Sequence, residues 1–520
     1  MLKIVLAFFS LSLQISKAEA QIDVLHYKYQ LALSDASDTL KGTAVITVKF
    51  LQNTKQFSLN LASVKGGKGM QVLNITSQQQ TFSNVHSHDT LFINAENSFQ
   101  KDSVQTFSIT YAGIPADGLI ISKNKYNERT FFADNWPDRA HQWIPCNDRP
   151  DDKATVAFEV IAPAQYKIIS NGALLEEKAL PQNLTVTHWA EKIPIPTKVM
   201  VIGAARFATK VFADSSVTPV SAWVYQKDSS IGFYDYSLAT SIVKFFSGYI
   251  DMYPFEKLAN VQSKTIFGGM ENAGCIFYAE NSVTGTRTSE ALLAHEIAHQ
   301  WFGNSVTEKS FAHVWLSEGF ATYMTHMYLE KKYGRDTLMK RLEDDRNDVI
   351  QFAKSWPRPV VDSLSTGMDL LNVNSYQKGG WVLHMLRGEV GDSVFQKIIQ
   401  TYYARFKSGN ADTWDFEKVA EDVSNKDLEA FFEQWLYQPG LPLLSIQSTI
   451  DSGGLKLTII QQHSLFHFPL EIGLVAKAGT MRKENIQIDQ KETTVTFKIS
   501  SIKNVLIDPD KKLLYAEVQR

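Results

Sequence analysis

Two histidines and a glutamate lie close together in the segment His295-Glu296-Ile297-Ala298-His299. In a helix, residues four apart share one face, one turn from each other, so both imidazoles can bind one metal ion. Glu296 then projects off that axis toward a metal-associated water molecule, whose proton a carboxylate can accept. The preceding Ala-Leu-Leu-Ala favours a helix, and Thr288 or Ser289 can cap it. The alternative is a chance match within an amphipathic helix.

A hydrolytic zinc site takes three protein ligands and leaves the fourth position for water. The candidate third ligand is Glu318, in Trp315-Leu316-Ser317-Glu318-Gly319, early in a second segment with apolar periodicity. Phe302-Gly303-Asn304 supplies a loop, so the two helices can pack with Glu318 facing the histidines. The apolar flanks of Glu318 predict that it points inward, where a charge needs a partner, rather than into solvent. We therefore predict one zinc ion per chain, held by His295, His299 and Glu318.

Three motifs resemble those of one enzyme family. Residues 295–323, HEIAHQWFGNSVTEKSFAHVWLSEGFATY, are similar to the zinc segment of the gluzincin aminopeptidases, which include the alanyl and membrane aminopeptidases and the leukotriene hydrolase branch. Gly268-Gly269-Met270-Glu271-Asn272 is similar to the exopeptidase signature of that family. Tyr376-Gln377-Lys378-Gly379 resembles the segment that bears its catalytic tyrosine. The likeness extends from the strands near His26 to Gly440-Leu441-Pro442, so it covers essentially the whole chain after the first 20 residues.

The resemblance implies a zinc-dependent aminopeptidase, which hydrolyses the first peptide bond of a peptide. Zinc would polarise the scissile carbonyl and acidify a water molecule. Glu296 would take the proton of that water and pass it to the leaving amine. Tyr376 would donate a hydrogen bond to the tetrahedral oxyanion. The alternative for Tyr376 is a buried structural tyrosine.

The exopeptidase signature implies the substrate contacts. Glu271 would hold the free α-ammonium group, and the backbone of Gly268 and Gly269 would pair with the peptide as an added strand. Met270 would line the pocket for the first side chain, whereas Asn272 has a structural role.

Two features depart from the family pattern. Alignment on Pro145-Cys146 places Trp136 where many members carry a second acid or amide that grips the substrate amine, and Asp134 or Asp138 could replace it. The sequence also ends after a C-terminal β region, so we expect a short form without the large helical domain of longer members. A more open active-site groove follows, and an epoxide hydrolase activity like that of the leukotriene branch is not expected.

The pattern of apolar residues predicts a multidomain α+β protein. Residues 21–225 alternate polar and apolar side chains, as in Thr43-Ala44-Val45-Ile46-Thr47-Val48, which indicates an N-terminal antiparallel β domain. Residues 226–438 are largely helical and predict a thermolysin-like catalytic domain, and residues 439–520 predict a C-terminal β-sandwich. The predicted helices span residues 236–250, 290–302, 314–333, 337–353, 376–388, 392–405, 413–423 and 428–437.

The N-terminus and the composition bear on location and partners. Residues 1–20 combine a basic start, a short apolar run and Ala18-Glu19-Ala20, which predict a cleaved signal peptide and export to the periplasm or the extracellular space. The alternative is an uncleaved anchor. No later segment is apolar enough for stable membrane insertion. The net charge of −3 over 520 residues gives no sign of a nucleic-acid partner. Cys146 and Cys275 are predicted to be buried free thiols.

Peptides are thus the predicted substrates, and the oligomeric state stays open. Two rival functions remain. The first is a zinc endopeptidase or oligopeptidase that needs no free N-terminus, which cleavage of N-blocked peptides would reveal. The second is a non-catalytic binding protein with a vestigial zinc site. The joint presence of His295, Glu296, His299, Glu318 and Tyr376 argues against that second rival.

Overall fold

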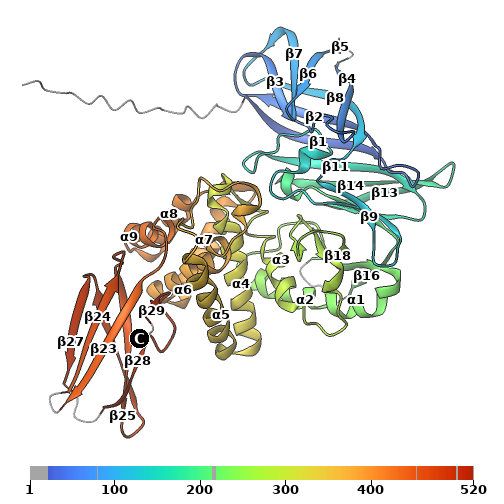
Figure 1. Cartoon of the computed structure of the whole chain (residues 1–520). Coiled ribbons are helices and arrows are strands. Elements are labelled where there is room, and N and C mark those ends of the chain that lie inside the picture. Colours follow the sequence, from blue (N-terminus) through green and yellow to red (C-terminus); the bar gives the residue numbers. More distant parts are fainter. Residues whose placement is uncertain (1–20, 79, 214–217, 452–453, 499–501, 519–520) are drawn as a thin grey trace, which may run out of the picture.

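The computed structural model describes residues 21–78, 80–213, 218–451, 454–498 and 502–518. Figure 1 shows a β-rich N-terminal part at one end, helices in the middle and the strands of the C-terminal part at the other end. This arrangement confirms the predicted α+β class with its β, helical and β parts. The predicted signal peptide, residues 1–20, lies outside the described residues.

The N-terminal part owes its sheets to strict alternation along the strands. In β2 (Leu40–Phe50), Ala44, Ile46 and Val48 are buried, and the residues between them are partly exposed. The largest sheet has the order β13-β14-β11-β1-β2-β8-β4-β5. One pairing departs from the antiparallel pattern, because β1 runs parallel to β11.

Two smaller sheets complete this part, in the orders β3-β7-β6 and β12-β15-β10-β9. The remaining strands of the N-terminal part are β1 (Ile22–Ala32), β3 (Thr54–Asn60), β4 (Gly69–Ser77), β5 (Gln80–Thr81), β6 (Ser83–Ser87), β7 (Thr90–Phe99), β8 (Val104–Ile114), β9 (Leu119–Lys123), β10 (Arg129–Ala133), β11 (Lys153–Pro163), β12 (Lys167–Ser170), β13 (Ala173–Leu180), β14 (Leu184–Pro196) and β15 (Ile202–Ala205).

The central part of the chain, predicted to be catalytic and called the catalytic part below, begins with a mixed sheet of order β16-β17-β18-β20-β19. Its strands are β16 (Phe207–Phe212), β17 (Val220–Tyr225), β18 (Leu258–Ser263), β19 (Gly269–Met270) and β20 (Cys275–Ala279). The boundary predicted at residue 225 therefore cuts through this sheet, since β17 pairs in parallel with β18. Sequence alternation marks β16 and β17 as strands but does not reveal which sheet they join. The edge strand β19 carries part of the exopeptidase signature.

The helices lie close to the predicted ranges, except for α1, whose residues 229–235 were not predicted to be helical. They are α1 (Ser229–Tyr236), α2 (Leu238–Tyr249), α3 (Glu290–Ala298), α4 (Trp315–Tyr333), α5 (Arg335–Ala353), α6 (Gly379–Val390), α7 (Asp392–Phe406), α8 (Thr413–Ser424) and α9 (Glu429–Phe432). Two predicted helices, 376–388 and 428–437, contain π-helical turns instead of a continuous α-helix. These turns, Asn374–Lys378 before α6 and Glu433–Tyr437 after α9, add a residue that apolar periodicity does not reveal.

Helix α4 is the centre of the catalytic part, because its residues from Trp315 to Leu329 are all buried. It packs against α3 on one side and α6 on another. A parallel pair of short strands, β21 (Val306–Glu308) and β22 (Gly409–Ala411), ties the loop after α3 to the segment before α8. A helix buried all round brings side chains of distant segments to one place.

The C-terminal part forms two sheets, of orders β27-β24-β23-β29 and β26-β25-β28. The strands are β23 (Leu443–Asp451), β24 (Gly454–Gln462), β25 (Phe468–Ala476), β26 (Met481–Ile488), β27 (Glu492–Phe497), β28 (Ile502–Ile507) and β29 (Ala516–Glu517).

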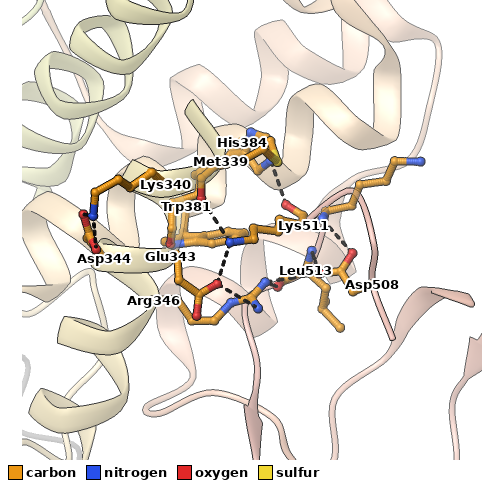
Figure 2. Close-up of polar contacts among 12 residues, drawn as sticks. Met339, Lys340, Glu343, Asp344, Arg346, Trp381, His384, Asp508, Lys511 and Leu513 are labelled. Carbon is orange, nitrogen blue, oxygen red and sulfur yellow. Dashed lines mark hydrogen bonds and ion pairs between the residues drawn. The ribbon is translucent and has the colours of Figure 1, made fainter. Parts of the chain in front are cut away.

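A polar junction joins the C-terminal part to the catalytic helices (Figure 2). Arg346 of α5 donates to Asp508 Oδ2 (3.2 Å) and to the Leu513 carbonyl (2.8 Å). On α6, His384 Nε2 lies 2.9 Å from the carbonyl oxygen of Lys511. These contacts bind the loop after β28 to α5 and to α6, the helix that follows Tyr376.

Two further predictions concern features outside the site. Cys146 and Cys275 are free and buried, as predicted. Among the described residues, none of the helices combines the length and apolar character needed to cross a membrane.

Candidate active site

The three predicted metal ligands meet between α3 and α4. His295 Nε2 lies 3.1 Å from His299 Nε2, and Glu318 Oε2 lies 3.3 Å and 3.1 Å from those two nitrogens. One ligand atom from each of the three residues lies within 4.8 Å of the others. Two imidazole nitrogens and one carboxylate oxygen around one point form a donor set typical of zinc.

The neighbours of His299 hold it in the orientation that a metal requires. Its Nδ1 lies 3.0 Å from the Phe302 carbonyl and 3.1 Å from Ser317 Oγ. When Nδ1–H donates to that carbonyl, Nε2 keeps a free lone pair toward Glu318. The residues present therefore fit a divalent cation at this point.

The charges in the site also favour a cation. Glu271, Glu296 and Glu318 are buried and line the same cavity as the two histidines. Burial lowers the pKa of His299, but the negative charges of the glutamates, Glu318 above all, outweigh it and raise that pKa to about 10. The pKa of Glu318 is depressed despite its burial, because His299 and His295 stabilise its anion. Such excess negative charge is what a bound dication neutralises.

Glu296 lies beside the edge strand β19. Burial raises its pKa well above the ordinary value, and the charges of Glu271 and Glu318 add to that rise while His299 opposes it. A carboxylate with a raised pKa is a stronger proton acceptor. A Cβ atom on Gly269 would lie 2.4 Å from Glu296 Oε1, so only glycine allows β19 to approach α3 this closely.

Tyr376 reaches the site from the π-helical turn before α6. Its ring centroid is 5.8 Å from that of His295, and the two planes differ by 17°. The approach depends on two glycines, since a Cβ on Gly319 of α4 would lie 2.9 Å from Gly379 Cα. Burial, with the nearby glutamates, holds the pKa of Tyr376 above its ordinary value, so its hydroxyl stays protonated and can donate.

Glu271 is a buried carboxyl group that forms no ion pair with the described residues. Its side-chain Oε1 has no hydrogen-bond donor among the described residues. Its backbone carbonyl accepts from Gln300 Nε2 (2.7 Å) and from Asn304 Nδ2 (2.7 Å), which fixes its position. An unpaired acceptor of this kind calls for a ligand that donates, such as an ammonium group.

One cavity, about 250 Å³ in volume, unites these groups. Its lining consists of Trp136, Phe267, Gly268, Gly269, Met270, Glu271, Leu292, His295, Glu296, His299, Glu318, Leu371 and Tyr376. Every residue that the sequence assigned to catalysis, substrate binding or zinc is in this set. The predicted structural residue Asn272 is buried next to it.

The candidates for a second amine anchor lie elsewhere. Asp134 is fully buried and accepts from Arg139 (2.8 Å), Thr265 Oγ1 (2.8 Å) and the Ile266 amide (3.0 Å). Its oxygens are therefore occupied by the protein itself. Asp138 is exposed and does not line the cavity, whereas Trp136 does.

The residues that hold the backbone of Glu271 and of the loop after α3 by hydrogen bonds were not predicted from the sequence. Gln300 follows the second histidine directly, so its place in the motif was an available signal. Lys153, from β11, donates to the carbonyl oxygens of Asn304 (3.1 Å), Ser305 (2.9 Å) and Gly409 (2.7 Å). Its sequence context, Asp-Asp-Lys, is that of a surface charge, so no local pattern reveals this contact.

Comparisons with known proteins agree with this site. The description "Peptidase M1 N-terminal domain" matches residues 24–199, and "Peptidase family M1 domain" matches residues 234–435. The chain belongs to peptidase family M1, whose members depend in general on zinc.

Glutamyl aminopeptidase of Sus scrofa is 27% identical over 461 residues, covering 82% of this chain and 48% of the relative. Aminopeptidase M1-C of Oryza sativa subsp. japonica is 28% identical over 323 residues, covering 59% of this chain and 37% of the relative. The chain thus spans about half the length, or less, of these relatives.

A solved structure shares the fold. Legionella pneumophila aminopeptidase A, in complex with aspartic acid, superposes with a TM-score of 0.84 at 18% identity, covering 97% of this chain and 60% of the other.

Proposed function

We propose that this protein is a zinc-dependent aminopeptidase that removes the first residue of peptides. The observation that carries the proposal is the unpaired Oε1 of Glu271 in the same cavity as His295, His299 and Glu318. A metal site alone suits any zinc peptidase. A buried acceptor beside it, held by its backbone and without a donor among the described residues, suits a substrate with a free α-ammonium group.

The chain's own residues would divide the work as follows. A bound zinc ion supplies Lewis acidity that polarises the scissile carbonyl and acidifies water. Glu296 accepts the proton of the attacking water and delivers it to the leaving amine. Tyr376 donates a hydrogen bond to the carbonyl oxygen as negative charge develops on it. Glu271 binds the ammonium group, and the free edge of β19 offers backbone groups to the peptide.

The test compares free and blocked substrates. Zinc-loaded protein should hydrolyse leucyl-aminomethylcoumarin and leave its N-acetylated form nearly untouched, and a chelator should abolish the activity. Equal cleavage of free and blocked peptides would favour the endopeptidase alternative, and no cleavage of either, at full zinc occupancy, would favour the non-catalytic one.

Two variants separate metal binding from chemistry. Glu296→Gln should keep one zinc per chain and lose most turnover, because an amide cannot accept the water proton. Glu318→Ala should lower zinc occupancy itself. Glu177→Gln, at an exposed position on β13, is the matched control and should behave as wild type.

We also propose that the protein is exported after cleavage before Gln21. The proposal rests on the residue pattern of 1–20. N-terminal sequencing of protein recovered from a native host should begin at Gln21; recovery of an intact Met1 from the exported fraction would contradict cleavage.

A further inference from the structure

We infer that Trp136, Phe267 and Met270 form an aromatic and apolar wall that selects a bulky apolar first residue and discriminates against an acidic one. The inference rests on the proposed aminopeptidase function and goes beyond it, because it names the substrate class. It assigns to Trp136 the role of a specificity-determining residue. It also sets the chain apart from the proteins called glutamyl aminopeptidases to which its sequence is similar.

The wall is a packed unit rather than a loose surface. Trp136 is 2% exposed, and its ring meets that of Phe267 edge-on at 6.4 Å between centroids. On another side it packs against Phe311 at 6.0 Å. Met270 is also 2% exposed and lines the same cavity. A close-packed apolar wall gains free energy when an apolar ligand group covers it.

The wall stands where the first side chain of a substrate must go. Glu271 follows Met270 directly, and both line the cavity with the three metal ligands. When the ammonium group of a substrate binds Glu271 and its first carbonyl group lies at the metal ligands, the first residue of the substrate spans the distance between them. The side chain of that residue therefore faces the part of the cavity lined by Trp136, Phe267 and Met270.

The wall is also fixed in place. Asp134 binds the Thr265 hydroxyl and the Ile266 amide, which holds the segment that carries Phe267. Arg139 Nε donates to the carbonyl oxygen of Trp136 at 2.8 Å. A rigid wall keeps its shape when a small or charged side chain enters, so a poor fit is not relieved by rearrangement.

No free cation is available for an acidic side chain. In the described part of the chain, neither lysine nor arginine lines the cavity. The guanidinium of Arg139 lies 5.8 Å from the Phe267 ring, but it is paired with Asp117 (3.0 Å) and Asp134 (2.8 Å).

The other nearby cation is Lys198, whose Nζ lies 5.9 Å from the Phe311 ring. It forms a fully buried ion pair with Glu308. An acidic side chain would therefore meet no lysine or arginine in a cavity that already holds three glutamates, at a cost that an apolar side chain avoids.

The first test is a substrate panel with unmodified, zinc-loaded protein. We expect kcat/KM for leucyl, methionyl and phenylalanyl aminomethylcoumarins to exceed that for the alanyl substrate by at least about tenfold. The advantage over the glutamyl substrate should be roughly a hundredfold. A glutamyl substrate cleaved as well as the leucyl one would overturn the inference and leave the aminopeptidase function intact. Failure to cleave any free-amine substrate would instead sink the proposed function.

The second test assigns the selectivity to the tryptophan. Trp136→Ala should reduce the ratio of kcat/KM for phenylalanyl over alanyl substrate by about tenfold, and Trp136→Phe should restore most of it. A merely structural role would lower all substrates alike, and that outcome would contradict the assignment. Zinc content and melting temperature are measured for each variant. Trp414→Ala, at a tryptophan that is 69% exposed on α8, is the control and should leave the ratio unchanged.

Discussion

In the proposed function, Glu271 separates an aminopeptidase from other zinc peptidases, and replacing it has a predictable cost. In Glu271→Gln the side chain keeps its shape but loses its charge. The wild-type carboxylate has one oxygen without a donor and forms no ion pair with the described residues, so a substrate ammonium would be its principal partner. A hydrogen bond to a charged group contributes about 1.5–3 kcal/mol. The expected loss is therefore about tenfold to a hundredfold in kcat/KM.

The geometry suggests a loss near the upper end of this range. Trp136 stands at the position where the family pattern has a second anchor for the substrate amine. The oxygens of Asp134 accept hydrogen bonds from Arg139, Thr265 and Ile266. Neither Trp136 nor Asp134 can thus compensate for Glu271. The zinc ligands should be unaffected, because Gln300 and Asn304 hold residue 271 by its backbone carbonyl, which the substitution leaves in place.

The assay measures kcat/KM for leucyl-aminomethylcoumarin and its N-acetylated form, with zinc content and melting temperature as controls. Glu271→Gln should slow the free-amine substrate strongly and change any slow cleavage of the blocked substrate much less. The reasoning is refuted if the substitution lowers both rates by the same factor at full zinc occupancy. It is refuted equally if the free-amine rate is unchanged.

Three other predictions follow from single contacts. Tyr376→Phe should leave KM similar and lower kcat, because its hydrogen bond forms mainly in the transition state; an unchanged kcat would remove the tyrosine from the mechanism. Burial, with the charge of Glu256, raises the pKa of Glu191 to about 8, so its stabilising contribution is complete below its ordinary pKa and is lost as pH rises through 8. Glu191→Gln should therefore flatten the fall in melting temperature between pH 6 and pH 9, and parallel profiles would show that the pKa of Glu191 is not raised in the folded protein. Arg346→Met leaves the buried Asp508 without its guanidinium partner and should reduce the free energy of unfolding by about 1.5–3 kcal/mol in urea denaturation; an unchanged midpoint would mean that this ion pair in Figure 2 adds no stability.

The helices and the three predicted metal ligands are examples of features that local sequence patterns predict. His295 and His299 meet because a helical turn places residues four apart on one face, and α3 follows from good helix formers before them. Glu318 was predictable because its apolar neighbours require an inward-facing helix. Glu271 and Tyr376 were predicted from the resemblance to the family. Its motifs occur in the same order along this sequence, however many residues separate them.

Other features of the site were beyond such reasoning. The membership of β16 and β17 in the catalytic sheet depends on their pairing with β18, which alternation does not encode. The contact of Lys153 with the loop after α3 joins residues 151 positions apart. The sequence around Lys153 resembles that of a surface segment, so it gives no sign of this contact of its ammonium group.

The sequence by itself determined the proposed chemistry of this protein, because the proposed metal ligands, base and hydroxyl donor are set by residue type and by spacing along single elements. Only the tertiary structure decided what surrounds that chemistry. Asp134 accepts hydrogen bonds from within the protein, and Trp136 lines the cavity in its place. Gly319 meets Gly379, so Tyr376 can approach His295. These outcomes depend on which surfaces pack together, and packing is a property of segments distant in the chain, which no local pattern specifies.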